Sequence, residues 1–229
     1  MIEIIDIQKR YGNQVALSIK KLEINKNELV GLVGNNGAGK TTLLSLILDL
    51  IAPTSGFVTS KSVKVSDTDA WKSYTGSFLN EGFLIPFLNP VEYLSFIGRL
   101  HGINETDVLG FLEENKLFFD INVFSEKYIR ELSAGNKNKV GILASILSKP
   151  EFLILDEPFS NLDPSSQSWL KSKLKDLSKE GVTVIISSHD LKHVTEICSR
   201  ILLLEEGRIV KDANTSNETL IELEKYFEI

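Results

Sequence analysis

A glycine-rich segment at positions 34–42, with the sequence GNNGAGKTT, constrains the fold of this 229-residue chain more than any other feature. It follows the apolar run 29–33 and precedes residues 40–50, which have helical spacing, so it joins a predicted strand to a predicted helix. Glycines let backbone N–H groups close around phosphate oxygens, and the start of the helix adds its positive end. The segment therefore predicts a phosphate-binding loop; the alternative is a turn that merely connects a strand to a helix.

The segment fits the pattern G-x-x-x-x-G-K-[ST], which assigns separate roles to its last residues. Lys40 is placed to reach the terminal phosphates of a nucleotide, which also makes it a catalytic candidate. The Thr41 hydroxyl is placed to bind Mg²⁺. The predicted nucleotide-binding positions are Gly34, Asn35, Asn36, Gly37, Ala38, Gly39, Lys40, Thr41 and Thr42.

A second apolar run, 152–155, ends in two acids, Asp156 and Glu157. Because nucleotide sites of parallel sheets lie at the carboxyl ends of the strands, Asp156 is expected beside the phosphate loop, where it can complete the magnesium shell. Neighbouring residues point to opposite sides of the backbone, so Glu157 is placed to accept a proton from an attacking water. The alternative is that both acids are solvated residues at a strand end.

Hydrophobic periodicity predicts an α/β fold around these segments. Apolar runs at 152–155, 182–187 and 201–204 are separated by helical stretches, which is the βαβ pattern of a parallel sheet. Two alternating stretches, 2–7 and 16–24, predict an antiparallel hairpin at the start of the chain.

The pattern changes between about residues 81 and 147, where no buried strand is evident. Helical spacing occurs there at 91–100, 105–117 and 139–147. We therefore predict a single domain over residues 1–229, in which 1–80 and 148–229 form the α/β core and about 81–147 form an inserted helical subdomain.

Charge and composition disfavour several partners. A net charge of −6 and a pI near 5.2 give no long-range attraction to a nucleic-acid backbone, so no nucleic-acid partner is expected. The single cysteine, Cys198, cannot form an internal disulfide, which suits a reducing cytosol. The N-terminus lacks the order of a secretion signal, and the apolar stretch 43–52 is well short of the ~20 residues of a membrane span. We expect a cytoplasmic protein that reaches a membrane only through a partner.

A third motif distinguishes among the families of nucleotide hydrolases that share the first two motifs. Residues 132–136, with the sequence LSAGN, precede the acidic strand and resemble the signature of ABC ATPases, usually LSGGQ. Residues 160–163 (SNLD) resemble the D-loop of that family, His189 resembles its switch histidine, and Tyr11 resembles its adenine-stacking aromatic. These matches occur in the family's order and cover nearly the whole chain.

The resemblance implies a P-loop NTPase fold with a parallel-sheet core, an N-terminal antiparallel β subdomain and an inserted helical subdomain. It also implies that Ser133 and Gly135, within a signature that includes Ala134 and Asn136, contact the γ-phosphate of ATP held by an opposite subunit. Asp163 is implied to lie in the same nucleotide site. Ala134 and Asn136 depart from the usual glycine and glutamine, but both changes are small and we expect a working signature.

The family also implies roles for residues outside the signature. His189 would hydrogen-bond to the γ-phosphate and orient the water and Glu157. Tyr11 would stack on adenine; capping of the first hairpin is the alternative. Glu81 stands where many members carry a magnesium-sensing glutamine and is a candidate metal ligand, with a solvated loop acid as the alternative.

Large apolar residues follow Glu81, and in transporters of this family the corresponding surface binds a short helix of the permease. The alternative is that these apolar residues form the core of the subdomain, and about half of them are expected to do so. We expect at least one of Phe83, Ile85 and Phe87 to be exposed as a docking residue.

The resemblance implies an ATP-hydrolysing subunit of an ABC transporter, with ATP and Mg²⁺ as cofactors. Its expected partners are a separate integral membrane permease and a second ATPase subunit, and its expected place is the inner face of the cell membrane. The alternative is a soluble ABC ATPase of the assembly type. We expect a homodimer with two active sites, since Tyr11, Lys40, Ser133, Glu157 and His189 are all intact; a degenerate partner subunit is the alternative. The cargo and the direction of transport are set by the permease.

Overall fold

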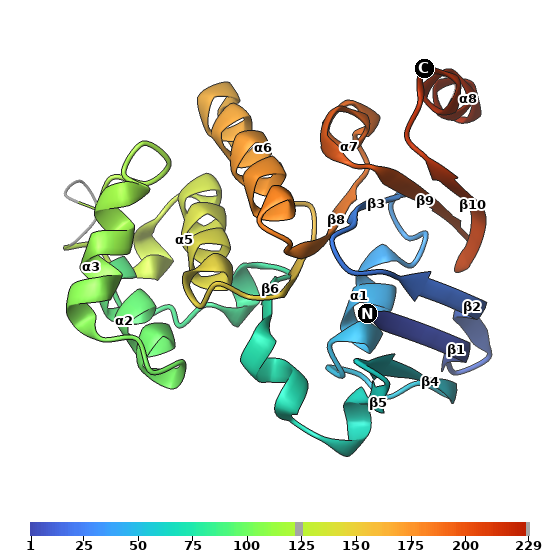
Figure 1. The fold of residues 1–229 in the computed structure, drawn as a ribbon, viewed down its shortest axis with the longest axis horizontal. Helices are drawn as coiled ribbons and strands as arrows, with labels where there is room; N and C mark the ends of the chain where they lie inside the picture. The colour runs from blue at the N-terminus through green and yellow to red at the C-terminus, as the bar shows by residue number, and fades with distance from the viewer. Residues whose placement is uncertain (122–125, 228–229) are drawn as a thin grey trace.

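A six-stranded, mostly parallel β-sheet forms the middle of the protein (Figure 1). The computed structural model describes residues 1–121 and 126–227. The strands lie in the order β10-β9-β3-β8-β7-β6, and every neighbouring pair is parallel except β9 and β10. Their bounds are β3 Leu29–Val33, β6 Thr75–Phe78, β7 Phe152–Leu155, β8 Thr183–Ser188, β9 Arg200–Glu205 and β10 Arg208–Asn214. This sheet confirms the predicted α/β class.

Strand β3 illustrates why the apolar runs form central strands. All of its residues are buried. Leu29 and Val33 pack into one hydrophobic cluster, whereas Val30 and Leu32 pack into a second cluster on the other face of the sheet. Successive side chains of a strand point to opposite faces, so a strand that is covered on both sides needs an unbroken apolar run.

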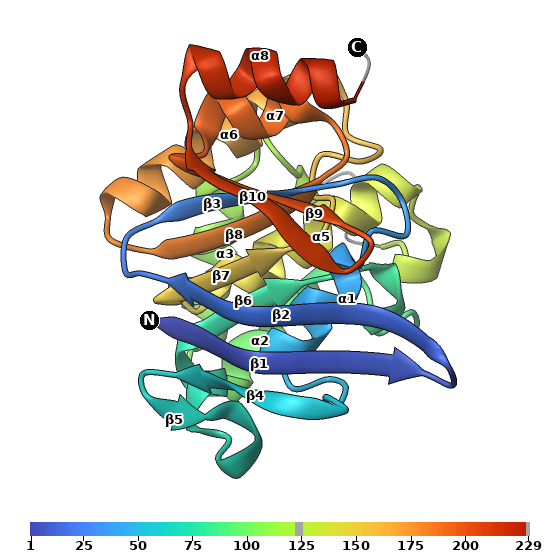
Figure 2. The same cartoon turned by 90° about the vertical axis from the view of Figure 1, so that its right-hand side faces the viewer.

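A second, antiparallel sheet covers one face of the central sheet (Figure 2). Its strands lie in the order β2-β1-β4-β5, with bounds β1 Ile2–Tyr11, β2 Gln14–Ile24, β4 Ser55–Ser60 and β5 Val63–Lys64. Helix α1 (Lys40–Ile47) buries its leucines in a cluster that also holds Ile2, Ile4 and Ile7 of β1. The expected antiparallel β subdomain is therefore confirmed, and it holds the helix that follows the phosphate loop.

Three helices cover the opposite face of the central sheet (Figure 2). They are α6 Pro164–Lys179, α7 Leu191–Ile197 and α8 Asn217–Tyr226. Each begins after a residue whose side chain accepts a hydrogen bond from the first turn, namely Asp163, Asp190 and Ser216. Such caps satisfy backbone N–H groups that have no partner within the helix.

A group of helices lies beside the β6 edge of the sheet (Figure 1). It contains α2 Pro90–Leu100, α3 Glu105–Glu114 and α5 Ala134–Leu147. Asn89, Asn104 and Ser133 cap these helices, and their apolar faces join the same cluster as α6 and α7. Residues 122–125 of the expected 81–147 subdomain lie outside the described residues, and the boundaries of that subdomain remain a prediction.

Some elements differ from the sequence prediction. The helix expected over 40–50 ends at Ile47, because Asp49 adopts a left-handed backbone with φ of 50°. The helix expected over 105–117 ends at Glu114, where Asn115 bonds back to the last turn. Strand β6 was not predicted, because only Gly76 and Phe78 among its four residues are buried and neither forms an apolar run.

Candidate functional site

The phosphate loop connects β3 to α1 at the carboxyl edge of the central sheet. Residues 35–37 are exposed there, whereas Lys40 is only 6% exposed. A cavity of about 220 Å³ brings most of the predicted loop residues together with the acidic strand end. It is lined by Asn35, Asn36, Gly37, Gly39, Lys40, Thr41, Thr42 and Glu157. The edge of the sheet thus carries a concave site bordered by backbone N–H groups at the start of a helix, which is the chemistry that binds phosphate.

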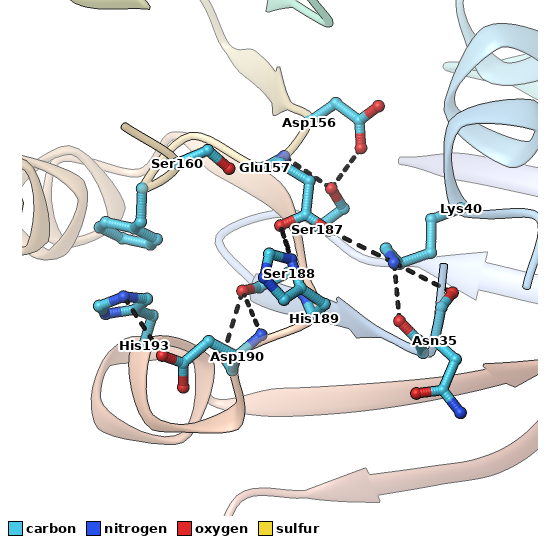
Figure 3. A network of polar contacts seen from close by, with 12 residues as sticks. Asn35, Lys40, Asp156, Glu157, Ser160, Ser187, Ser188, His189, Asp190 and His193 are labelled. Atoms are coloured by element: carbon cyan, nitrogen blue, oxygen red, sulfur yellow. Dashed lines mark hydrogen bonds and ion pairs between the residues drawn. The ribbon is translucent and has the colours of Figure 1, made fainter. Parts of the chain in front are cut away.

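Lys40 has three oxygen partners at this site (Figure 3). Its ammonium donates to the carbonyl oxygens of Gly34 at 2.7 Å and Asn35 at 3.3 Å. It also lies 3.3 Å from Oε1 of Glu157. The buried cation is therefore held by groups that a bound triphosphate can replace, since phosphate oxygens offer more negative charge than carbonyls.

Asp156 is joined to the phosphate loop. The Thr41 hydroxyl donates to its Oδ2 at 2.5 Å, and the Ser187 hydroxyl donates to its Oδ1. Burial raises the pKa of Asp156 above its ordinary value, and the hydrogen bonds from Ser187 and Thr41 oppose that rise. The carboxylate and the Thr41 hydroxyl are adjacent oxygen donors, so they fit the one or two protein ligands that Mg²⁺ takes beside substrate phosphates.

Glu157 lies between Lys40 and His189 (Figure 3). Its backbone is left-handed, with φ of 47°, and its N–H donates to Ser187 Oγ at 2.8 Å. Its Oε2 lies 2.8 Å from Nδ1 of His189 and also accepts from the His189 N–H at 3.3 Å. A non-glycine residue in this region is uncommon and is held there by its surroundings. The carboxylate is thus fixed at the cavity, with a titratable ring beside it.

Ser187 was not among the predicted site residues. It is fully buried in β8, where its hydroxyl accepts from the Glu157 backbone and donates to Asp156. A polar residue at the end of an otherwise apolar strand was the available signal in the sequence. Ser187 fixes both acids relative to each other.

The signature residues Ser133, Ala134, Gly135 and Asn136 lie at the start of α5, outside the phosphate-loop cavity. Ser133 is the N-cap and accepts from the Asn136 N–H at 3.3 Å. Several contacts join this helix to residues 160–163. Asn138 donates to the Ser160 carbonyl at 2.7 Å, and Gly135 lies against the Asn161 carbonyl. The signature and the D-loop segment therefore form one surface.

Gly135→Ala is expected to weaken this junction, because an added Cβ would lie 2.3 Å from the Asn161 carbonyl oxygen. Overpacking of this kind costs about 1–3 kcal/mol. The matched control is Gly110→Ala in α3, where the new methyl would meet open space and should stabilise by up to about 1 kcal/mol. Thermal unfolding of the two variants checks this. A Gly135→Ala protein as stable as the Gly110→Ala protein would contradict the close contact.

Asp163 caps α6. It accepts from the Ser166 N–H at 2.9 Å, from the Ser166 hydroxyl at 2.6 Å and from the Ser165 hydroxyl, and it lies 3.2 Å from the Lys139 ammonium. These hydrogen bonds, first those of the two serines, hold the pKa of Asp163 well below its ordinary value. Its contacts within the chain hold the D-loop segment on α6 and α5, and a contact with nucleotide remains a prediction.

The two remaining candidate residues, Tyr11 and Glu81, lie outside the phosphate-loop cavity. Tyr11 ends β1 with 55% of its surface exposed, and the Lys9 ammonium lies 5.1 Å from its ring centroid. Glu81 lies just after β6, where its carboxylate forms an ion pair with Lys137 of α5 at 3.1 Å. Both residues are accessible to solvent, and their roles toward adenine and Mg²⁺ remain predictions.

The loop after Glu81 exposes large apolar side chains, as predicted. Phe83, Ile85 and Phe87 are all exposed, and the Arg130 guanidinium lies 5.3 Å from the centroid of the Phe87 ring. A cavity of about 180 Å³ opens beside Phe83, between β6, α2 and α5. It is lined by Thr75, Gly76, Ser77, Phe78, Phe83, Tyr93, Ile97, His101, Gly141, Ala144, Ser145 and Ser148.

The geometry described above agrees with comparisons to known proteins. A family model described as ABC transporter matches residues 17–160. An uncharacterised ABC transporter ATP-binding protein of Bacillus subtilis (strain 168) is 35% identical over 210 residues, which is 92% of this chain and 70% of the relative. A lantibiotic transport ATP-binding protein of Streptococcus pyogenes is 30% identical over 224 residues, which is 97% of this chain and 95% of the relative.

A solved structure has the same fold. The dimeric bacterial ABC transporter cassette MJ0796 superposes with a TM-score of 0.84 at 25% identity, covering 95% of this chain and all of that chain. Within residues 1–121 and 126–227, no helix combines the length and the apolar character needed to cross a membrane. On the family match, the identity to its relatives and the geometry of the site, this chain belongs to the ABC transporter family, among its ATP-binding proteins.

Proposed function

We propose that the protein is the ATP-hydrolysing motor of a membrane transporter, in which two such subunits close on ATP and Mg²⁺ and drive a separate permease. One observation carries the ATPase part: Glu157 is held between Lys40 and His189 at a cavity formed by the phosphate loop. A module that only binds nucleotide has no need of a fixed carboxylate and histidine at this place.

Hydrolysis uses these residues in turn. As ATP enters the cavity, Lys40 exchanges its contacts with the loop carbonyls and Glu157 for the terminal phosphates. Glu157 then accepts a proton from the water that attacks the γ-phosphorus, while the bond between that phosphorus and the β,γ-bridging oxygen breaks. His189, hydrogen-bonded to Glu157, orients the carboxylate and contacts the γ-phosphate. Mg²⁺, held by Thr41 and Asp156, would neutralise charge on the phosphates.

Dimerisation completes the proposed site. Ser133 and Gly135 lie on the surface that includes residues 160–163, outside the cavity formed by the chain's own phosphate loop. The start of α5 presents backbone N–H groups and a helix dipole, which attract a phosphate. We propose that in a head-to-tail dimer this surface of one subunit covers the ATP on the other, as suits the similarity to a cassette solved as a dimer.

The permease is proposed to bind at the cavity between β6, α2 and α5. Phe83 lines this cavity, and Ile85 and Phe87 are exposed in the loop that follows it. Exposed apolar groups of this size mark protein interaction sites. This contact would hold the protein at the inner face of the cell membrane. The cargo is chosen by the permease, so the names of relatives, such as lantibiotic transport, describe those relatives.

The Glu157→Gln variant, tagged in its native cells and solubilised gently with ATP and Mg²⁺, tests the transporter proposal. We expect it to co-purify with an integral membrane protein, identified by mass spectrometry, because the closed state is held without turnover. The matched control adds Phe83→Ser and Phe87→Ser, which should remove the membrane protein and leave the ATP-dependent dimer intact. If only soluble partners were recovered, the transporter proposal would be wrong, and the result would favour a soluble ABC ATPase.

A further inference from the structure

The two segments that carry Glu157 and His189 meet at two points. At the first point, Oε2 of Glu157 lies 2.8 Å from Nδ1 of His189. The second point lies further along both segments, where the ring of His193 in α7 stacks on the ring of Phe159. The ring centroids are 4.5 Å apart, and the ring planes differ by 28°. An aromatic contact therefore accompanies the polar contact between the acid and the histidine.

The stack is buried and does not depend on the polar atoms of the imidazole. Phe159 is only 4% exposed. Nδ1 of His193 is buried, and within the part of the chain that the structure describes it has no hydrogen-bond partner. Nε2 lies 3.6 Å from Oδ2 of Asp190, which is too far for a hydrogen bond. Burial lowers the pKa of His193 below its ordinary value, so the side chain is neutral at pH 7 and packs as an aromatic ring.

Phe159 belongs to the turn that connects Glu157 to the D-loop segment. The Ser160 N–H donates to the Glu157 carbonyl at 3.0 Å, and the Gln167 side chain donates to the Phe159 carbonyl at 3.3 Å. The Ser160 carbonyl in turn accepts from Asn138 of α5 at 2.7 Å. A shift of the Phe159 ring would therefore displace the backbone in both directions, toward the Glu157 carboxylate and toward the signature.

His193 is joined to His189 through the start of α7. The N-cap of this helix is Asp190, whose N–H donates to Ser188 Oγ at 3.0 Å. The Ser188 hydroxyl donates to the Asp190 carbonyl at 3.1 Å. These two hydrogen bonds enclose the backbone of His189, and Figure 3 shows His193 directly beside Asp190. The position of the His193 ring is thus linked to the backbone that carries His189.

We propose that His193 is a positioning residue for ATP hydrolysis: its stack on Phe159 holds α7 against the segment of Glu157, so that Glu157 and His189 keep their relative places during turnover. The polar contact between Glu157 and His189 changes when Glu157 takes up a proton, whereas the aromatic contact involves no proton. His193 does not line the phosphate-loop cavity, so ATP binding itself should not depend on it. This inference rests on the proposed role of Glu157 as the proton acceptor.

The His193→Leu variant tests the proposal, because it removes the ring and keeps an apolar side chain of similar volume. We expect kcat, measured as phosphate release at saturating ATP and Mg²⁺, to fall about two- to tenfold, which is the effect of losing one stacked aromatic pair. The Kd for ATP, measured by isothermal titration, should stay within about twofold of that of the unmodified protein. His193→Phe keeps a stacked ring and should restore kcat to within about twofold.

Two further variants separate positioning from a general loss of stability. Trp71→Phe removes a buried hydrogen bond to the Val65 carbonyl, at 3.0 Å, in the hydrophobic cluster that does not contain Phe159. It should lower the Tm and leave kcat unchanged when turnover is measured well below the unfolding temperature. Adding His193→Leu to Glu157→Gln should lower turnover by less than about twofold more, because residues that act as a unit have non-additive effects.

Several outcomes would overturn the proposal. These are an unchanged kcat in His193→Leu, an equal loss of kcat in His193→Phe or Trp71→Phe, and a full further loss in the Glu157→Gln background. If turnover is lost in Glu157→Gln but not in His193→Leu, only the role of His193 is wrong. Near-normal turnover in Glu157→Gln would instead contradict the proton acceptor on which this inference rests.

Discussion

Glu157→Gln is expected to lower ATP turnover by about 10²–10⁴-fold, the range that a positioned proton acceptor contributes. Gln cannot accept the proton of the attacking water, yet its side-chain amide has nearly the same shape and can still contact His189. The backbone N–H of residue 157 still donates to Ser187. ATP binding should be retained. The loss of the ion pair between Glu157 and Lys40, at 3.3 Å, also removes one contact that ATP must replace. Phosphate release at saturating ATP measures the turnover, and size-exclusion chromatography with ATP follows dimer formation.

The matched control for this change is Glu151→Gln, which alters an exposed glutamate paired with Lys61 just before strand β7. Its turnover should stay close to that of the unmodified protein. Near-normal turnover in Glu157→Gln would contradict the assignment of the proton acceptor. Loss of ATP binding in the same variant would instead indicate that Glu157 supports the loop rather than the chemistry.

Lys40→Met is expected to weaken ATP binding by about 10- to 150-fold. The buried ammonium offers charge-assisted hydrogen bonds to the terminal phosphates, and such bonds contribute about 1.5–3 kcal/mol each. Methionine keeps most of the apolar stem, so the packing around this buried position changes little. Equilibrium titration with ATP measures the effect, and turnover at saturating ATP shows how much of the loss lies in binding.

Two comparisons sharpen this test. Lys116→Met removes the same charge from an exposed position that is paired with Glu113, and it should leave ATP binding unchanged. The unfolding temperature of Lys40→Met should stay near that of the unmodified protein. Unaltered ATP affinity in Lys40→Met would refute the proposed contact of this residue with phosphate. A large loss of stability would mean that the lower affinity comes from unfolded protein and not from a lost contact.

The parts of the fold that were predictable have local causes. Strands β3 and β7 were placed correctly because each is an unbroken apolar run, covered on both faces. Strand β6 was not predicted because its sequence, TGSF, contains no apolar run. The strand forms through its pairing with β7 and the close approach of α5 to Gly76. An added Cβ at Gly76 would lie 1.8 Å from the Ser145 carbonyl, a constraint that no local pattern reveals.

The residues of the site also differ in whether the sequence could reveal them. Residues within one motif, such as Lys40 and Thr41, could be assigned from spacing and from the family resemblance. Ser187 could not, because its role depends on contacts with Asp156 and Glu157, about 30 residues earlier in the chain.

The alternation of β3 between two hydrophobic clusters has a consequence for folding. Val30 and Leu32 belong to the cluster shared with the antiparallel sheet, and Leu29 and Val33 belong to the cluster shared with the helices. Neither layer can separate from the sheet without exposing residues of the strand that carries the phosphate loop. Substitutions that destabilise the outer sheet would therefore affect the nucleotide site through cooperative unfolding. In a cell, such substitutions would reduce the amount of folded protein before they change its catalytic activity.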